Sequence, residues 1–256
     1  MRLTQSVLAM LLCCIQYSSM ATIVIRTAAQ ESSEPKYIAI NQAGKPAIGG
    51  ICVDIFRAME NLAPNLRFQG DQVWMPRMRI DAHFRDNRID VICGVQNITR
   101  NTEHYQLLAT PLFTVNYLLA VRVDDPIKVQ SWDDIRQLDN EGIIMAIHGF
   151  GIVDILHKLG GLQIDAGATS SLSNLRKLLA GRGRFYCHRS PGIKAAIKSA
   201  HLENKIRLLD QPTLSEKFYM GVRKNLAPEQ IKLISDALQV LDKNGELKRI
   251  FEQYRE

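Results

Sequence analysis

Apolar and polar positions alternate between strand-like runs and helix-like spacings along most of the chain. The alternating, β-branched segment 22–26 predicts a strand. At 53–62 apolar residues recur at the three- and four-residue spacing of a helix, which Pro64 ends. A second helix begins at Pro76, and the apolar segment 89–93 follows it as a buried strand. This strand–helix–strand rhythm is typical of a parallel α/β sheet.

The rhythm restarts after a β-rich run at 113–123, which is longer than one ordinary strand requires. The pattern then predicts helices at 131–138, 152–159, 172–179 and 192–200, and strands at 143–147, 162–164, 184–188 and 206–209. A second β-rich run at 217–222 precedes two helices at 228–241 and 246–254. Two α/β sets joined by two extended crossings predict two lobes, and the cleft between them is the natural site for a small molecule.

The first 21 residues have the pattern of an export signal. Arg2 gives a positive start, residues 6–15 form a short apolar run, and residues 19–21 have the small-x-small form that signal peptidase reads. The apolar run is too short to span a bilayer comfortably. We therefore expect cleavage after Ala21 and a periplasmic protein that is not integral to the membrane, rather than a membrane or lipid anchor.

The composition disfavours nucleic acid as a partner. The 256 residues are 46% hydrophobic and 23% charged, which is ordinary for a globular protein. The net charge of +6 is dispersed along the chain. We interpret Arg77, Arg79, Arg85 and Arg88 as the solvated face of one helix. The sequence also has no basic stripe with interleaved aromatic residues, so binding of nucleic acid is disfavoured.

Three cysteines, Cys52, Cys93 and Cys187, would remain after cleavage of the signal. Export implies an oxidising compartment, but an odd number of thiols allows at most one bridge within the chain. We interpret all three as small buried apolar residues. The six histidines have no metal-ligand spacing, and we expect neither a metal nor another cofactor.

A set of short motifs occurs in a fixed order along the chain. These motifs are Gly50–Asp54, Trp74, Asn87–Asp90, Ile98–Thr99, Pro111–Phe113, Ser131–Asp134, Ile147–Gly149, Ala180–Gly183 and Gly245–Phe251. Their order resembles the bacterial extracellular solute-binding proteins of family 3, the periplasmic amino-acid-binding components of ABC transporters. The resemblance implies an α/β, two-lobed periplasmic binding protein fold of type II, in which each lobe is a mostly parallel sheet flanked by helices.

The resemblance also implies a division of the chain. Lobe 1 would comprise residues 22–117 and 219–256, and lobe 2 would be the inserted segment 118–218. A two-strand hinge would lie near 117–122 and 216–222. Members of this family are usually monomers.

The residues that hold amino acids in this family are substituted here. An Arg three positions after the Thr of the Ile-Thr pair clamps the α-carboxylate in the family, but that position is Thr102 and the nearest guanidinium is Arg100. The acidic residue expected after the strand 183–187 is replaced by His188, Arg189 and Ser190. A buried ammonium group without an anionic partner is costly. A neutral, anionic or aromatic solute therefore fits the resemblance better than a free α-amino acid held in the usual way.

Other candidate ligand-binding residues lie on predicted turns and strand ends. They are the aromatics Tyr37 and Trp74, Gly94 and Asn97 near the end of a lobe 1 strand, and Gly149, Phe150 and Gly151 before a lobe 2 helix. The Gly149–Gly151 turn can present backbone N–H groups to an anion or can merely connect strand and helix. His148 and His188 end two strands of one lobe at the edge facing the cleft, although most such residues are structural or solvated.

The favoured function is capture of a small solute for a separate ABC permease. One alternative is an enzyme on the same scaffold, similar to cyclohexadienyl dehydratases, for which His148 and His188 would be the candidate acids. The other alternative is a ligand sensor that reports to a separate membrane protein.

Overall fold

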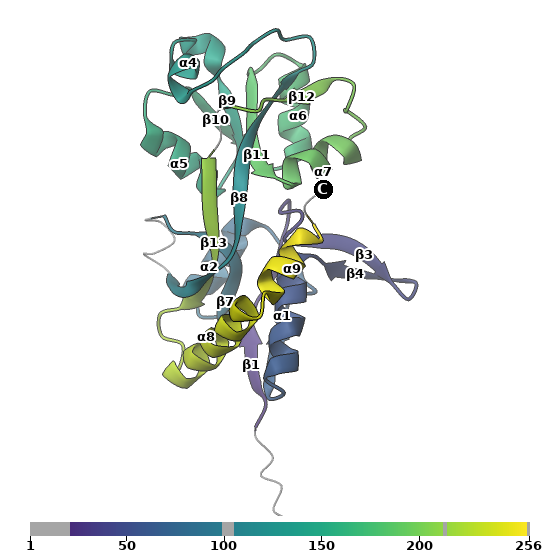
Figure 1. The fold of residues 1–256 in the computed structure, drawn as a ribbon, viewed down its shortest axis with the longest axis vertical. Coiled ribbons are helices and arrows are strands. Elements are labelled where there is room, and N and C mark those ends of the chain that lie inside the picture. The colour runs from purple at the N-terminus through teal and green to yellow at the C-terminus, as the bar shows by residue number, and fades with distance from the viewer. Residues whose placement is uncertain (1–20, 99–104, 212–213, 255–256) are drawn as a thin grey trace, which may run out of the picture.

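Two lobes joined by two long strands make up the structure (Figure 1). It is a computed structural model, which describes residues 21–98, 105–211 and 214–254. Arg100, Thr102 and nearly all of the predicted signal segment lie outside the described residues. Among the described residues, no helix has the length and apolar character needed to cross a membrane.

Lobe 1 is built from three small strand pairs covered by helices. Its strands are β1 (Ile23–Arg26), β2 (Ala29–Gln30), β3 (Ile38–Gln42), β4 (Lys45–Gly49), β5 (Leu66–Gln69), β6 (Trp74–Met75) and β7 (Val91–Gln96). Its helices are α1 (Ile51–Leu62), α2 (Arg77–Arg85), α8 (Pro228–Lys243) and α9 (Glu246–Glu252). β1 pairs with β5 and β2 with β6 in parallel, whereas β3 and β4 form an antiparallel hairpin.

Lobe 2 has the predicted alternation of strands and helices. Its elements are α4 (Trp132–Arg136), the 3-10 helix η1 (Asp139–Gly142), β9 (Ile144–Ile147), α5 (Gly151–Leu159), β10 (Ile164–Ala168), α6 (Ser171–Leu179), β11 (Phe185–Ser190), α7 (Gly192–Ser199) and β12 (Ile206–Leu208). β9 lies between β10 and β11 and is parallel to both. Parallel strands bring their carboxyl ends, and the turns that follow them, to one edge of the sheet.

The two long β-rich runs form the strands that connect the lobes. β8 (Tyr105–Arg122) pairs antiparallel with β13 (Leu214–Arg223). β13 also pairs with β7 of lobe 1, while the C-terminal half of β8 pairs with β11 and β12 of lobe 2. One seven-stranded sheet therefore runs through both lobes, and this explains why the run at 113–123 is longer than a single lobe requires.

A disulfide bond joins Cys52 of α1 to Cys93 of β7, with a Cα–Cα distance of 5.9 Å. Cys187 is a free, buried thiol. The interpretation of all three cysteines as small apolar residues is thus wrong for Cys52 and Cys93. The bridge depends on how α1 lies against β7, and this register is not visible in the spacing of cysteines along the chain.

Removal of this bridge by Cys52→Ala with Cys93→Ala is expected to lower the free energy of unfolding by about 4 kcal/mol, because the bridge closes a loop of 41 residues in the unfolded chain. Urea unfolding of the oxidised protein measures the change. Cys187→Ala is the matched control, since it removes a buried sulfur without a bridge. An equal loss in the control and in the double variant would contradict the prediction.

Asp90, which directly precedes β7, links β7 to the ends of β1 and β13 through partly buried hydrogen bonds. Its carboxylate accepts bonds from the backbone N–H and the guanidinium of Arg26 and from the guanidinium of Arg223. Burial raises the pKa of Asp90, but these hydrogen bonds outweigh burial and hold the pKa below its usual value. The charged form is therefore favoured more in the folded chain than in the unfolded one.

A depressed pKa contributes stability that is present above about pH 4 and is lost as the pH falls through the folded pKa. Asp90→Asn is expected to lower stability at pH 7 by about 1.5 kcal/mol, because Arg26 is partly exposed and can be solvated, and to make the acid loss of stability shallower. Urea unfolding at several pH values measures both effects. The exposed Asp86→Asn is the control, and superimposable acid profiles for Asp90→Asn and wild type would contradict the role of this carboxylate.

Candidate functional site

Three of the predicted site residues gather in lobe 2, on the side that faces lobe 1. Phe150, which precedes α5, and His188 and Arg189 at the end of β11 are all buried. The Arg189 guanidinium carbon lies 5.6 Å from the centroid of the Phe150 ring, a distance typical of a cation–π contact. The imidazole of His188 stacks on Tyr186 with centroids 5.6 Å apart. These side chains form a buried polar and aromatic wall at the edge of the lobe 2 sheet.

The turn at Gly149–Gly151 lies directly against lobe 1. A Cβ atom on Gly149 would be 3.2 Å from the sulfur of Met78, and one on Gly151 would be 2.1 Å from Oε1 of Gln96. Gly149 has a φ of 76°, a left-handed conformation that glycine adopts readily. Both glycines therefore allow the two lobes to approach closely at this point.

On lobe 1, the buried ammonium of Lys36 is held by oxygen atoms of uncharged groups. Nζ of Lys36 donates to Oε1 of Gln30 and to the backbone oxygen of Gly94, each at 3.0 Å. A Cβ atom on Gly94 would lie 2.6 Å from Cδ of Lys36, so a larger residue at position 94 would displace the lysine. The predicted site residue Gly94 thus acts by making room for a cation that the sequence reasoning missed.

Arg77 at the start of α2 is buried, so its interpretation as part of a solvated basic face is wrong. Its guanidinium donates to both carboxylate oxygens of Asp81 at 2.9 and 3.0 Å, and Tyr105 donates to the same carboxylate. Arg79, Arg85 and Arg88 are exposed as expected. The pairing of Arg77 with Asp81 one helical turn later makes its burial possible.

The remaining predicted site residues do not converge on this region in the same way. Tyr37 is buried in the main hydrophobic core, Trp74 is 37% exposed on β6, and Asn97 is exposed. His148 is exposed, with Nδ1 3.2 Å from the oxygen of Ala166, whereas His188 is buried. The ligand-binding roles proposed for these residues stay predictions.

Direct contact between the lobes centres on Glu34, in the loop between β2 and β3. Nη2 of Arg189 donates to the backbone oxygen of Glu34 at 3.0 Å. At the start of α7, a Cβ atom on Gly192 would be only 2.4 Å from the same oxygen. The lobes are therefore closed on one another at Glu34.

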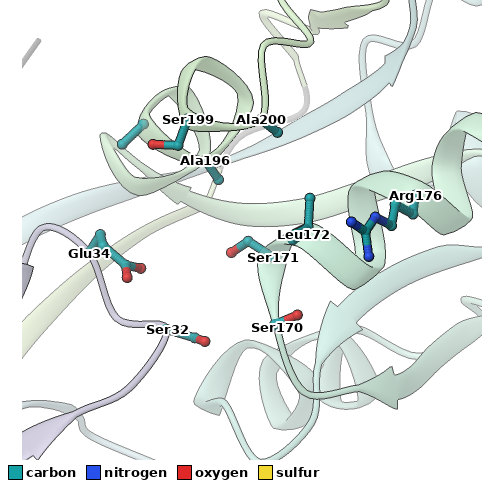
Figure 2. A pocket seen from close by; sticks show the side chains of 10 residues that line it. Ser32, Glu34, Ser170, Ser171, Leu172, Arg176, Ala196, Ser199 and Ala200 are labelled. Atoms are coloured by element: carbon teal, nitrogen blue, oxygen red, sulfur yellow. The ribbon is translucent and has the colours of Figure 1, made fainter. Parts of the chain in front are cut away.

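A cavity of about 460 Å³ opens beside this contact, between the lobes. In Figure 2, Ser32 and Glu34 of lobe 1 lie on one side, and Ser170 and Ser171 at the start of α6 lie on the other. Arg176, farther along α6, and residues of α7 complete the wall. Hydroxyl groups thus line an inter-lobe space large enough for a small polar molecule.

The electrostatics of the lobe contact are dominated by buried basic groups. Burial lowers the pKa of Lys36 well below its usual value, and the nearby Arg189 and Arg77 lower it further. Burial also lowers the pKa of His188, again with Arg189 adding to the effect, and lowers the pKa of Arg189. His188 is therefore neutral at pH 7. No group of histidines, cysteines and carboxylates among the described residues could hold a metal ion.

The sequence did not predict site roles for Glu34, Lys36, Arg77, Gln96 and Tyr117. Glu34, Lys36 and Tyr117 lie near Arg189, whereas Arg77 lies near Lys36 and Gln96 lies against Gly151. Tyr117 stands opposite Arg189 in the antiparallel pairing of β8 with β11. Glu34 takes part in the hydrogen bond to Arg189 through its backbone oxygen. Every residue type has this oxygen, so the sequence cannot indicate the contact. Lys36 and Arg77 lie in segments where a basic side chain is ordinarily interpreted as solvated.

The comparisons with known proteins agree with this architecture. Residues 25–256 match the model of bacterial extracellular solute-binding proteins, family 3, and the chain belongs to that family. No curated protein matches the sequence.

Many solved structures share the fold at low sequence identity. A mutant of ArgBP from T. maritima is 17% identical over 90% of this chain and 94% of that chain, with a TM-score of 0.71. A histidine kinase sensor domain with similarity to periplasmic binding proteins is 19% identical over 91% of this chain and 95% of that chain, with a TM-score of 0.72. A structure from a study of glutathione import through GshT of Streptococcus mutans is 15% identical over 92% of this chain and 95% of that chain, with a TM-score of 0.72. These likenesses establish the type II periplasmic binding protein fold.

Gly192→Ala is expected to hold the lobes apart, because rotation of a side chain cannot relieve an overlap with the backbone oxygen of Glu34. Small-angle X-ray scattering of the unliganded protein should give a larger radius of gyration than wild type. Gly167→Ala, in lobe 2 but near Asp165 of its own lobe, is the control. If Gly192→Ala and wild type had the same radius of gyration, the closed contact would not exist in solution.

Proposed function

We propose that the protein captures a small solute between its two lobes and delivers it to a separate ABC permease in the membrane. The observation that carries this proposal is the buried polar layer where the lobes meet. Lys36 and Gln96 come from lobe 1, and His188 and Arg189 from lobe 2. Burying polar and charged groups at a contact between lobes costs free energy that apolar residues would avoid, so a ligand is the simplest reason for it.

The solute is not a free α-amino acid held in the manner usual for the family. The position of the family's acidic residue falls at His188 and Arg189, and Arg189 is buried beside Phe150. A second positive charge there would repel the ammonium group of an amino acid. The family's carboxylate clamp has Thr102 in place of its Arg, and Arg100 remains a candidate substitute.

The division into lobes is part of the same proposal. Lobe 1 comprises 22–117 and 219–256, lobe 2 comprises 118–218, and the hinge lies near 117–122 and 216–222. β8 pairs with β13 from Tyr105 to Tyr117, and beyond Tyr117 it pairs with β11 and β12 of lobe 2. Two adjacent strands that pass from one lobe to the other support a two-strand hinge. Bending two paired strands lets each lobe move as a unit without breaking its core.

The proposal extends to the location and state of the protein. The chain is exported by a signal cleaved after Ala21, acts in the periplasm as a monomer, and catalyses no reaction. The partner is a permease, as for the amino-acid ABC transporter proteins that share the fold, or a separate membrane sensor.

A binding protein of this kind gains thermal stability from its solute by mass action, with the gain growing as the concentration rises. A thermal-shift screen of the mature protein against amino acids, carboxylic acids, aromatic compounds and polyamines is expected to find such a solute. The solute recovered from the complex should also be chemically unchanged. Conversion of the solute to a product would support an enzyme, and a screen without any hit would contradict solute capture by this cleft.

A further inference from the structure

Two fully buried cations from opposite lobes lie near each other at the lobe contact. Lys36 and Arg189 are each 3% exposed. Arg189 donates to the backbone oxygen of Glu34, two residues before Lys36, and the two cations interact electrostatically. The lobes therefore bring a primary ammonium and a guanidinium into one enclosed region.

Neither cation forms an ion pair with a carboxylate among the described residues. Lys36 donates to an amide oxygen and a backbone oxygen, and Arg189 donates to a backbone oxygen. By contrast, Arg77 and Arg26 each bind a carboxylate directly. Burial lowers the pKa of both cations, and the carboxylates of Asp81 (toward Lys36) and Glu34 (toward Arg189) offset burial only in part. The described residues therefore compensate these two positive charges incompletely.

Arg189 also retains unused donor capacity. Its Nε has no hydrogen-bond partner among the described residues, although the side chain is almost completely buried. The guanidinium lies near the Phe150 ring, which limits its movement. A planar fork of N–H groups held in this way matches the two oxygens of a carboxylate or phosphate group.

The inter-lobe cavity reaches Glu34, the residue whose backbone oxygen accepts from Arg189, although neither Lys36 nor Arg189 lines that cavity. Glu34 connects the two features, because its backbone oxygen accepts from Arg189 while its side chain lines the cavity in Figure 2. Serine hydroxyls on the far wall of that cavity can bind polar groups by donating or accepting hydrogen bonds. A solute with one anionic end and a polar body fits this combination.

The geometry points to an oxyanion site between the lobes, in which Lys36 and Arg189 together bind a carboxylate or phosphate group of the solute. This inference rests on the proposed function and adds the chemical class of the ligand. The anion adds negative charge that the described residues supply only in part, and it contacts both cations only when both lobes contribute. Binding and closure are thus coupled by the same two residues.

The test compares four probes with wild type and with three single variants. Inorganic phosphate and succinate carry the two oxyanion groups, succinamide is the neutral counterpart of succinate, and arginine is the amino acid named for several proteins of the same fold. The variants are Lys36→Met, Arg189→Met and, as the control, the exposed lobe 2 cation Lys198→Met. Thermal shift and calorimetry at constant ionic strength measure binding.

Phosphate or succinate is expected to stabilise wild type and Lys198→Met equally. The probe that binds more tightly, phosphate or succinate, identifies the anionic group of the solute. Lys36→Met and Arg189→Met should each weaken that binding roughly 10- to 100-fold, as expected for loss of a charged hydrogen bond. Should Arg189→Met not fold, Arg189→Lys keeps the charge but loses the fork and should still weaken binding. Succinamide should bind more weakly than succinate.

Two results would overturn the oxyanion site. One is that neither phosphate nor succinate stabilises wild type at concentrations up to about 10 mM. The other is that the anion binds Lys36→Met and Arg189→Met as tightly as it binds wild type. If a neutral or cationic solute from the wider screen stabilises wild type and both variants equally, the oxyanion site is wrong while solute capture stands. A wider screen without any hit removes solute capture as well.

Discussion

The antiparallel pairing of β8 with β13 is the constraint on which the rest of the structure depends. Both strands leave one lobe and enter the other, so a single sheet extends through the whole molecule. Because backbone hydrogen bonds fix the register of these strands, the positions of the two lobe edges are fixed as well. Rotation about the pair still leaves the lobes free to separate. The strands thus determine which side chains can meet, while the contacts at Glu34 and Gly151 determine how closely they meet.

The polar groups at this meeting place are supported by the lobes behind them. The backbone N–H of Cys52 donates to the oxygen of Lys36, and Cys93 directly precedes Gly94, whose oxygen accepts from the Lys36 ammonium. The Cys52–Cys93 bridge therefore ties together the two backbone segments that hold this lysine. A buried cation needs such support, because a mobile side chain would reach water and recover its hydration. The disulfide stabilises lobe 1 and also keeps Lys36 at the lobe contact.

The sequence allowed prediction of the fold but of only part of the site. Periodicity and motif order gave the α/β lobes and the long crossing strands, because these depend on local spacing that each segment carries by itself. The substitution at His188 and Arg189 was also visible, since it replaces an expected acidic residue. Arg77 was misinterpreted because its partner Asp81 lies on the same helix and the two are buried together. Lys36 gave no signal, because Gly94 lies 58 positions away and contributes only a backbone oxygen.

On this scaffold, a few substitutions at the lobe contact can change the charge that a ligand must carry. In the family pattern, a cation on lobe 1 and an acidic residue on lobe 2 complement a zwitterion. Here lobe 2 presents Arg189 where that acidic residue would lie, and lobe 1 presents Lys36 from a different loop. Because both lobes carry positive charge at the contact, closure without a ligand brings like charges together. Closure around an anion instead places Lys36 and Arg189 next to a negative charge. Under the proposed oxyanion site, the free energy of closing the hinge depends on the charge of the solute. The proposal thus assigns an anionic class of solute to a fold that this chain shares with its structural neighbours at 15–20% sequence identity.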